Sequence, residues 1–271
     1  MSKAQPSLEE ALAGTEAAVD AALKSAAAAA RSLKRLRGFV RKGDLKEIRK
    51  ALDASRQAVQ TFSEKADEAA KSWDFDEEAY FSGRAYVDEL LATGARMGFR
   101  LTEMDDRLYC HPFLVRVLPQ NRLVTIDKMR ERSLRPTALI SRLQDLQKRP
   151  VRFTPEAFLA TLYKAYKILV KARGQDDRAD GTVIPLSDVH NLLTLLPGSA
   201  REYSRQEFGR DMYLLDQSGT NRTKDGAFLS FHGSTGTRSA SQTIRIVGRD
   251  GQERKYYGIA FSRPTEESPC P

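Results

Sequence analysis

The first 75 residues contain two heptad repeats joined by a glycine, and this pattern constrains the fold more than any other feature. Small or apolar residues recur at alternating spacings of four and three from Leu8 to Val40, and again from Leu45 to Trp73. This spacing is typical of helices that pack along one stripe. A capping-box pattern precedes each repeat, and Gly43 separates them. The sequence therefore predicts a long antiparallel helical hairpin over residues 1–75, with arms of about 45–50 Å.

The turn of this hairpin is strongly basic. Residues 31–50 hold nine Lys or Arg and two Asp or Glu. Such a cluster is suited to contact phosphates or an acidic protein surface, although charged helix faces are often only solvated. The hairpin itself is open to three interpretations: a packing element, a dimerisation arm or a docking arm. The candidate contact residues of the tip are Lys34, Arg35, Arg37, Arg41 and Lys42.

The middle segment, residues 76–150, predicts a helix, a small antiparallel β-meander and a second helix. The first helix is expected from Asp76 to Gly98, the meander over residues 99–126 and the second helix near 136–148, because turn residues punctuate short apolar runs. Residues 121–152 hold nine basic and three acidic residues, a second positive cluster. Its candidate nucleic-acid contacts are Arg130, Arg132 and Arg135.

No motif in the chain predicts catalysis or a cofactor. Cys110 and His111 are adjacent, so on a strand they point to opposite faces and cannot act as nucleophile and base. Two cysteines and three histidines have no zinc-binding spacing, so no metal site and no cofactor are predicted. A metal-dependent nuclease remains a second alternative, because several acids and a lysine surround the meander. These residues are Glu103, Asp105, Asp106, Asp127 and Lys128.

Residues 151–263 have an informative order of elements. A helix is expected from Thr154, a short strand over 182–186, a helix capped by Ser187 and, after a turn, a helix that begins with a capping box at Ser204. Three β-like segments follow, at 227–231, 243–247 and 255–261. A loop at 232–242 that is rich in Gly, Ser and Thr separates the first two, and a hairpin turn at Asp250-Gly251 joins the last two. This order resembles the winged helix-turn-helix superfamily over about 110 residues. The resemblance lies in the element order and in no diagnostic residue motif.

The resemblance implies that the helix beginning at Ser204 occupies the recognition position and that the loop at 232–242 is the wing. Residues on or near these two elements would then contact a major groove or phosphates. Winged helices also serve as protein-docking modules, so this second role stays open. The implied contact residues are Arg201, Tyr203, Arg205, Arg210 and, in the wing, Arg238.

The predicted fold class is α+β, mainly helical: a hairpin (1–75), a helix and meander (76–150), a winged-helix-like domain (151–263) and a tail (264–271). The chain carries a net charge of +8, has no apolar run long enough to cross a bilayer and does not begin like a signal peptide. We therefore expect a cytoplasmic protein without membrane contact.

The main functional hypothesis is a non-catalytic, DNA-associated protein that binds the duplex backbone, with the hairpin serving self-association or docking on a protein partner. The first alternative is an adaptor subunit of a larger bacterial DNA-handling assembly built around an ATPase.

Overall fold

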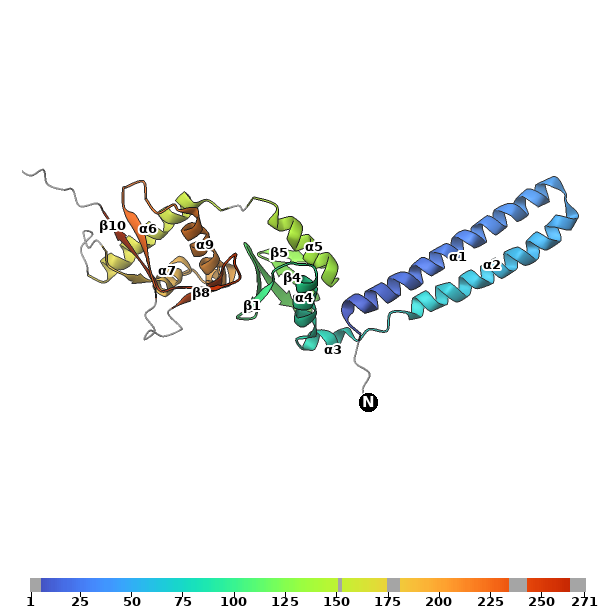
Figure 1. Cartoon of the computed structure of the whole chain (residues 1–271), viewed down its shortest axis with the longest axis horizontal. Coiled ribbons are helices and arrows are strands. Elements are labelled where there is room, and N and C mark those ends of the chain that lie inside the picture. The colour runs from blue at the N-terminus through green and yellow to red at the C-terminus, as the bar shows by residue number, and fades with distance from the viewer. Residues whose placement is uncertain (1–5, 151–152, 175–180, 234–242, 264–271) are drawn as a thin grey trace, which may run out of the picture. The chain divides into compact units, whose positions relative to one another are not determined.

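The computed structural model describes residues 6–150, 153–174, 181–233 and 243–263. Its contacts divide the chain into two compact units. The hairpin unit comprises Met1–Met97, Pro119–Asn121 and Ser133–Ser141, and the sheet unit comprises Gly98–Leu118, Arg122–Arg132 and Arg142–Pro271. The predicted class, α+β and mainly helical, is confirmed (Figure 1).

The helical hairpin is confirmed as α1 (Leu8–Lys42) and α2 (Leu45–Lys71). The side chain of Ser7 accepts from the backbone N–H of Glu10, and the Glu10 carboxylate accepts from the N–H of Ser7, so the capping box at the start of α1 is complete. At the turn, Gly43 adopts φ +72°, a left-handed conformation that glycine tolerates best. Asp44 then caps α2. These caps confirm the helix starts expected from sequence.

The seam of the hairpin differs from the predicted one along both helices. On α2 the predicted seam residues Leu45, Leu52 and Val59 are exposed. On α1, Ala29 and Ser32 face α2. Ala29 is buried, and the Oγ of Ser32 lies 3.2 Å from the Oγ of Ser55 on α2. The prediction had instead placed Leu33 and Val40 inside, and both are exposed. Small side chains let two helices approach closely, so the narrow seam accepts Ala and Ser and leaves the larger residues outside it.

The hairpin unit also holds α3 (Glu77–Ser82), α4 (Ala85–Arg96) and the 3-10 turn η1 (Pro119–Asn121). The prediction of a single helix from Asp76 to Gly98 is therefore wrong, since the first helix ends at Gly83 and a second one follows. The base of the hairpin is anchored by Glu9, whose carboxylate accepts hydrogen bonds from Thr137 and from Arg135. Residues 136–141 of α5 (Pro136–Gln147) belong to this unit, and the rest of α5 belongs to the sheet unit.

The sheet unit begins with the predicted meander, which the structure confirms as five antiparallel strands in chain order. The sequence predicted four of them and missed the last. The strands are β1 (Thr102–Met104), β2 (Arg107–Cys110), β3 (Phe113–Leu118), β4 (Leu123–Ile126) and β5 (Met129–Glu131). The turn at Asp105 and Asp106 has positive φ at both residues, which suits a tight hairpin turn.

The helices of the C-terminal part are α6 (Pro155–Ala172), α7 (Leu186–Leu193), α8 (Ser199–Glu202) and α9 (Arg205–Ser218). The capping box of Ser204 with Glu207 opens α9 as predicted. The cap expected at Ser187 is wrong, because α7 already begins after Pro185. The short helix α8 was not expected.

The strands of this part are β6 (Ile184–Pro185), β7 (Phe228–His232), β8 (Ile244–Val247), β9 (Glu253–Tyr256) and β10 (Gly258–Ser262). They form a three-stranded sheet in the order β6–β10–β7 and a separate β8–β9 hairpin. The segment expected as one strand, residues 255–261, is thus two strands in different sheets. Most of the expected wing, residues 234–242, lies outside the described residues.

One hydrophobic core holds the sheet unit together. It gathers buried side chains from the meander, such as Tyr109 and Leu114, with Phe208 and Met212 of α9 and with Ile259 of β10. Across the residues that the structure describes, no helix has the length and apolar character needed to span a membrane.

Candidate nucleic-acid interface

The helix α9, expected to be the recognition helix, is packed on most of its sides. Every residue from 206 to 215 is buried or half-buried. An ideal Cβ on Gly209 would lie 2.9 Å from Cγ2 of Ile244, so β8 lies directly against this helix. On another side the ring of Tyr213 contacts the ring of His111. The helix therefore cannot present its central residues to a DNA groove.

Arg210, a predicted DNA contact, is committed to internal partners. Its Nη1 lies 2.8 Å from Oδ1 of Asp127, and its Nη2 lies 3.0 Å from Oδ1 of Asp211. Burial raises the pKa of Asp127 in spite of this neighbouring guanidinium. Tyr203 is also engaged, because its hydroxyl donates to Asp211 at 2.8 Å. We therefore remove Arg210 and Tyr203 from the candidate interface.

The other residues proposed from the resemblance are scattered. Arg201 is exposed on α8, and Arg205 is exposed at the start of α9 with its Nη2 3.4 Å from the carbonyl oxygen of Thr243. Arg238 lies outside the described residues.

The basic candidates of residues 121–152 divide in two. Arg135 belongs to the hairpin unit, where its guanidinium binds Glu9 at 2.7 Å and Glu16 at 2.6 Å, so it is unavailable to phosphates. Arg130 and Arg132 are exposed on and just after β5. They remain candidates.

Three arginines form a row across one face of the five-stranded sheet. Arg116 pairs in register with Thr125 on β4, and Thr125 pairs with Arg130 on β5, so these three side chains share a face. On the other side of β3, Leu108 pairs with Val115, and extending this register places Arg107 opposite Arg116. We call Arg107, Arg116 and Arg130 the arginine row.

The positive charges of the arginine row are not paired with carboxylates of the described residues. Among the described residues, no carboxylate lies within 4.0 Å of any of the three guanidinium groups, whereas Arg142, Arg210 and Arg245 all have such partners. Like charges at directly opposed positions on a sheet are destabilising. An external anion would remove this repulsion. Sequence reasoning missed Arg107 and Arg116, because strand register is needed to place them beside Arg130.

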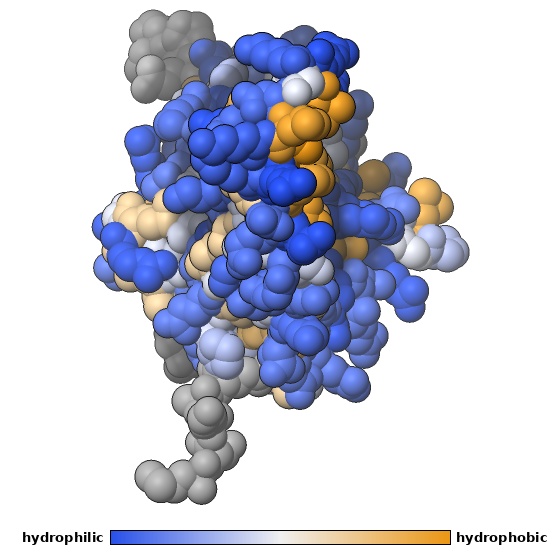
Figure 2. Space-filling view, turned by 90° about the vertical axis from the view of Figure 1, so that its right-hand side faces the viewer, coloured by the Kyte–Doolittle hydropathy of each residue, from blue (hydrophilic) through white to orange (hydrophobic). Residues whose placement is uncertain are grey.

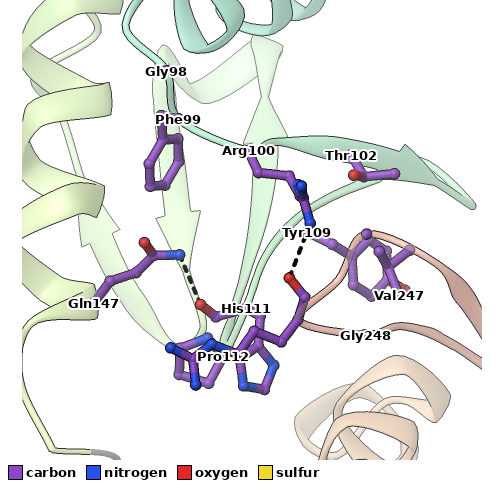
Figure 3. A pocket seen from close by; sticks show the side chains of 12 residues that line it. Gly98, Phe99, Arg100, Thr102, Tyr109, His111, Pro112, Gln147, Val247 and Gly248 are labelled. Carbon is purple, nitrogen blue, oxygen red and sulfur yellow. Dashed lines mark hydrogen bonds between the residues drawn. The ribbon is translucent and has the colours of Figure 1, made fainter.

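A cavity of about 520 Å³ lies beside this sheet (Figure 3). Gln147 donates to the carbonyl oxygen of His111 at 2.7 Å, and Arg100 donates to the carbonyl oxygen of Arg249 at 3.4 Å. Burial, followed by the charge of Arg249, lowers the pKa of His111. The hydroxyl of Tyr109, a further lining residue, is buried without a hydrogen-bond partner among the described residues. Arg100 and Arg249 give the cavity a basic lining.

The residues considered for catalysis are separated or engaged. Burial, followed by the charge of Asp127, raises the pKa of the Cys110 thiol far above its usual range. Asp105 binds Arg245 at 2.5 Å, and Asp127 binds Arg210. In the part of the chain that the structure describes, no three His, Cys, Asp or Glu side chains are grouped so as to hold a metal ion. The arrangement gives no support to the nuclease alternative.

The basic tip of the hairpin is fully solvent-accessible. All five predicted tip residues are exposed at the C-terminal end of α1: Lys34, Arg35, Arg37, Arg41 and Lys42.

Comparisons with protein-family models, curated proteins and solved structures found no match to this chain.

Proposed function

We propose that this chain is a non-catalytic cytoplasmic protein that binds the phosphate backbone of duplex DNA through the arginine row. The observation that carries the proposal is the register that aligns Arg107, Arg116 and Arg130 on one face of the sheet without carboxylate partners, with Arg116 and Arg130 exposed and Arg107 half-buried. Neighbouring strands lie about 4.8 Å apart, so Arg116 and Arg130 are separated by roughly 10 Å. The guanidinium groups sit on long side chains and can each bind a phosphate of the DNA backbone.

The binding is expected to be independent of base sequence. Phosphate contacts position a protein on DNA, whereas base contacts in the grooves give specificity. The packing of α9 removes the helix that the winged-helix resemblance assigned to the major groove. The arginines on the sheet face would contact phosphates only and would not distinguish one base from another.

We also propose that residues 153–263 form a winged-helix-like module used for packing and protein contact. Two observations support this. The strand β6, which lies between the first two helices of this part, joins β10 and β7 in one sheet. The central residues of α9 are covered by β8 and by the meander.

The test is binding of the purified chain to a labelled duplex of about 30 base pairs at about 50 and 200 mM salt. Wild-type protein should bind at the lower salt concentration and lose affinity steeply at the higher one. Each lost phosphate contact reduces the slope of log K against log salt by about 0.9. The triple variant Arg107→Gln, Arg116→Gln, Arg130→Gln should therefore show a slope shallower by about 2 to 3.

The matched control removes the same charge elsewhere on the sheet unit. Lys164, Lys167 and Lys171 are exposed on α6, and their triple replacement by Gln should leave most of the affinity and the slope intact. An equal loss in this control would show that net charge, and not the arginine row, drives binding. Absence of binding by the wild-type chain at the lower salt concentration would overturn the proposal and favour the adaptor alternative.

A further inference from the structure

The hairpin has a narrow seam of small residues, and its heptad positions can be assigned from burial. Along α1 the seam residues are Leu8, Ala11, Thr15, Ala18, Ala22, Ser25, Ala29, Ser32, Leu36 and Phe39. Along α2 they are Ile48, Ala51, Ser55, Ala58, Phe62, Lys65, Ala69 and Ser72. All are buried or half-buried except Phe62, which is 36% exposed. Their spacing of three and four defines heptad positions a and d.

A second stripe, at heptad position e, is apolar along the whole length of both helices. In an antiparallel pair the e positions of the two helices flank the seam on the same side. The contacts of Ser32 with Ser55 and of Thr15 with the carbonyl oxygen of Ser72 fix the register, which groups the e residues into layers. From tip to base the layers are Val40 with Leu45, Leu33 with Leu52, Ala26 with Val59, Val19 with Ala66, and Leu12 with Trp73.

Most of this e stripe is exposed, and Leu12, Ala26 and Ala66 are half-buried. Leu45 is 75% exposed, Val40 55%, and both Leu33 and Leu52 48%. Figure 2, which looks at the molecule from the right-hand side of Figure 1, shows hydrophobic side chains gathered in one column between hydrophilic ones. Soluble monomers rarely expose a continuous apolar strip of this length, and such strips mark interaction surfaces. The opposite face, at heptad positions c and g, carries charged and small residues.

The charge of the hairpin changes sign along its length. Residues 31–56, the tip half, hold ten basic and three acidic residues. The base half, residues 8–30 and 57–71, holds three basic and seven acidic residues. A parallel partner of the same kind would place positive beside positive, whereas an antiparallel one would place each tip beside an oppositely charged base.

We propose that the e stripe binds the e stripe of a second copy of this chain, with the two hairpins antiparallel in a four-helix bundle. A two-fold axis then crosses the Ala26–Val59 layer, which meets its own copy. On α1 the large residue Leu33 lies over the smaller Val19 of the other chain, and on α2 Leu52 lies over Ala66. Apolar burial and charge complementarity thus favour the same arrangement, independently of DNA binding.

The first test is the mass of the full-length chain in solution by sedimentation velocity. Wild-type protein should be dimeric at micromolar concentration. The variant Leu33→Glu, Leu52→Glu should be monomeric while keeping its helical circular dichroism, because two buried charges would face the partner. The matched control Ala28→Glu, Ala54→Glu adds the same charge at exposed g positions and should remain dimeric. A monomeric wild type, or a dimer unaffected by the first variant, would overturn the proposal.

The second test determines the orientation by disulfide formation in chains whose Cys110 and Cys270 are replaced by Ala. The variant Val59→Cys should cross-link to itself, because Val59 lies near the two-fold axis. A mixture of Val40→Cys and Leu12→Cys chains should also cross-link. Efficient cross-linking of Val40→Cys with Leu45→Cys chains instead would indicate parallel hairpins and would overturn the antiparallel arrangement.

A charge swap tests whether opposite charges at the tip and base of the hairpin favour the antiparallel dimer. One chain carries acidic replacements of Arg37, Arg49 and Arg56 at the tip, and another carries Lys replacements of Glu16, Asp20 and Asp67 at the base, none of which is at position c or g. Each should dimerise at least tenfold more weakly alone than wild type, since like charges then face each other. Their mixture should regain wild-type affinity as a heterodimer. Lack of recovery on mixing would contradict the antiparallel pairing.

Discussion

Arg210 of α9 and Asp127, in the turn between β4 and β5, form an ion pair in which Nη1 lies 2.8 Å from Oδ1. The same carboxylate oxygen accepts the backbone N–H of Leu114 at 3.0 Å. One carboxylate oxygen of Asp127 therefore links the β4–β5 turn both to the backbone of β3 and to helix α9. This contact belongs to the interior of the sheet unit, where both side chains are mostly buried.

Replacing Arg210 by Met should lower the free energy of unfolding by about 2 kcal/mol, because Asp127 and Asp211 would lose a charged hydrogen-bond donor in a mostly buried setting. The exposed control Arg201→Met should change it by no more than about 0.5 kcal/mol. Chemical denaturation measures both values. Equal stability of Arg210→Met and wild type would show that the ion pair has no structural role and would return Arg210 to the DNA-contact candidates.

The close approach of α9 and β8 at Gly209 gives a second prediction. An added Cβ at Gly209 would lie 2.9 Å from Cγ2 of Ile244 and 3.3 Å from the carbonyl oxygen of Arg245. Gly209→Ala should therefore destabilise the chain by about 1–3 kcal/mol through overpacking.

The matched control is Gly38→Ala, also within a helix, where an added Cβ meets nothing within 4 Å. It should stabilise α1 by up to about 1 kcal/mol, because Ala favours the helical conformation. Thermal unfolding should shift the two variants in opposite directions. Stabilisation of the chain by both replacements would mean that β8 does not constrain α9 at Gly209.

The contact of Glu9 with residues 135–137 predicts a pH dependence. Burial alone would raise the pKa of Glu9, but the N–H of Thr137 and the guanidinium of Arg135 outweigh it and lower the pKa below 4.5. An acid whose pKa is lower in the folded state stabilises the fold above its unfolded pKa, and this stabilisation is lost as the pH falls through the folded value.

Glu9→Gln should accordingly unfold at a lower temperature than wild type at pH 7. The difference should shrink as the pH falls below the ordinary value of 4.5. Asp20→Asn, on the exposed surface of the same helix, serves as the control for a lost negative charge. A difference between Glu9→Gln and wild type that stays constant down to roughly pH 3 would contradict the assignment.

Local signals in the sequence predicted the helix starts well. The capping boxes at Ser7 and Ser204 lie within four residues of the groups that they bind, so they identified α1 and α9 correctly. The heptad pattern predicted the hairpin but misplaced half of the seam on each helix, because Leu33 and Ser32 on α1 both fit a spacing of three or four, as do Leu52 and Ala51 on α2. Only the partner helix decides between them, since Ser55 accommodates a small neighbour.

The candidate interface depended on relationships that no local pattern contains. Arg210 looked free because its partner, Asp127, is distant in the sequence. Arg107 and Arg116 gave no signal until the register of β2 with β3 placed them side by side. The charge cluster around Arg130 was visible, but which of its arginines pair internally was not: Arg135 is bound by Glu9.

The hydroxyl of Tyr109 gives the last prediction, because it is buried without a hydrogen-bond partner among the described residues. Burial, followed by the charge of Asp105, raises the pKa of Tyr109 to about 12, so the hydroxyl is neutral at pH 7. An unpaired buried polar group costs about 1–3 kcal/mol, and its removal without loss of shape recovers part of that cost. Tyr109→Phe should therefore stabilise the chain by about 1 kcal/mol.

Tyr166 offers a matched comparison, since it is as deeply buried but donates to the carbonyl oxygen of Thr182 at 2.9 Å. Tyr166→Phe removes that hydrogen bond and leaves an acceptor unpaired, so it should destabilise the chain by about 1 kcal/mol. Denaturant titration of both variants measures whether each change raises or lowers the free energy of unfolding. Destabilisation by Tyr109→Phe of the size seen for Tyr166→Phe would mean that the Tyr109 hydroxyl has a bonding partner in solution.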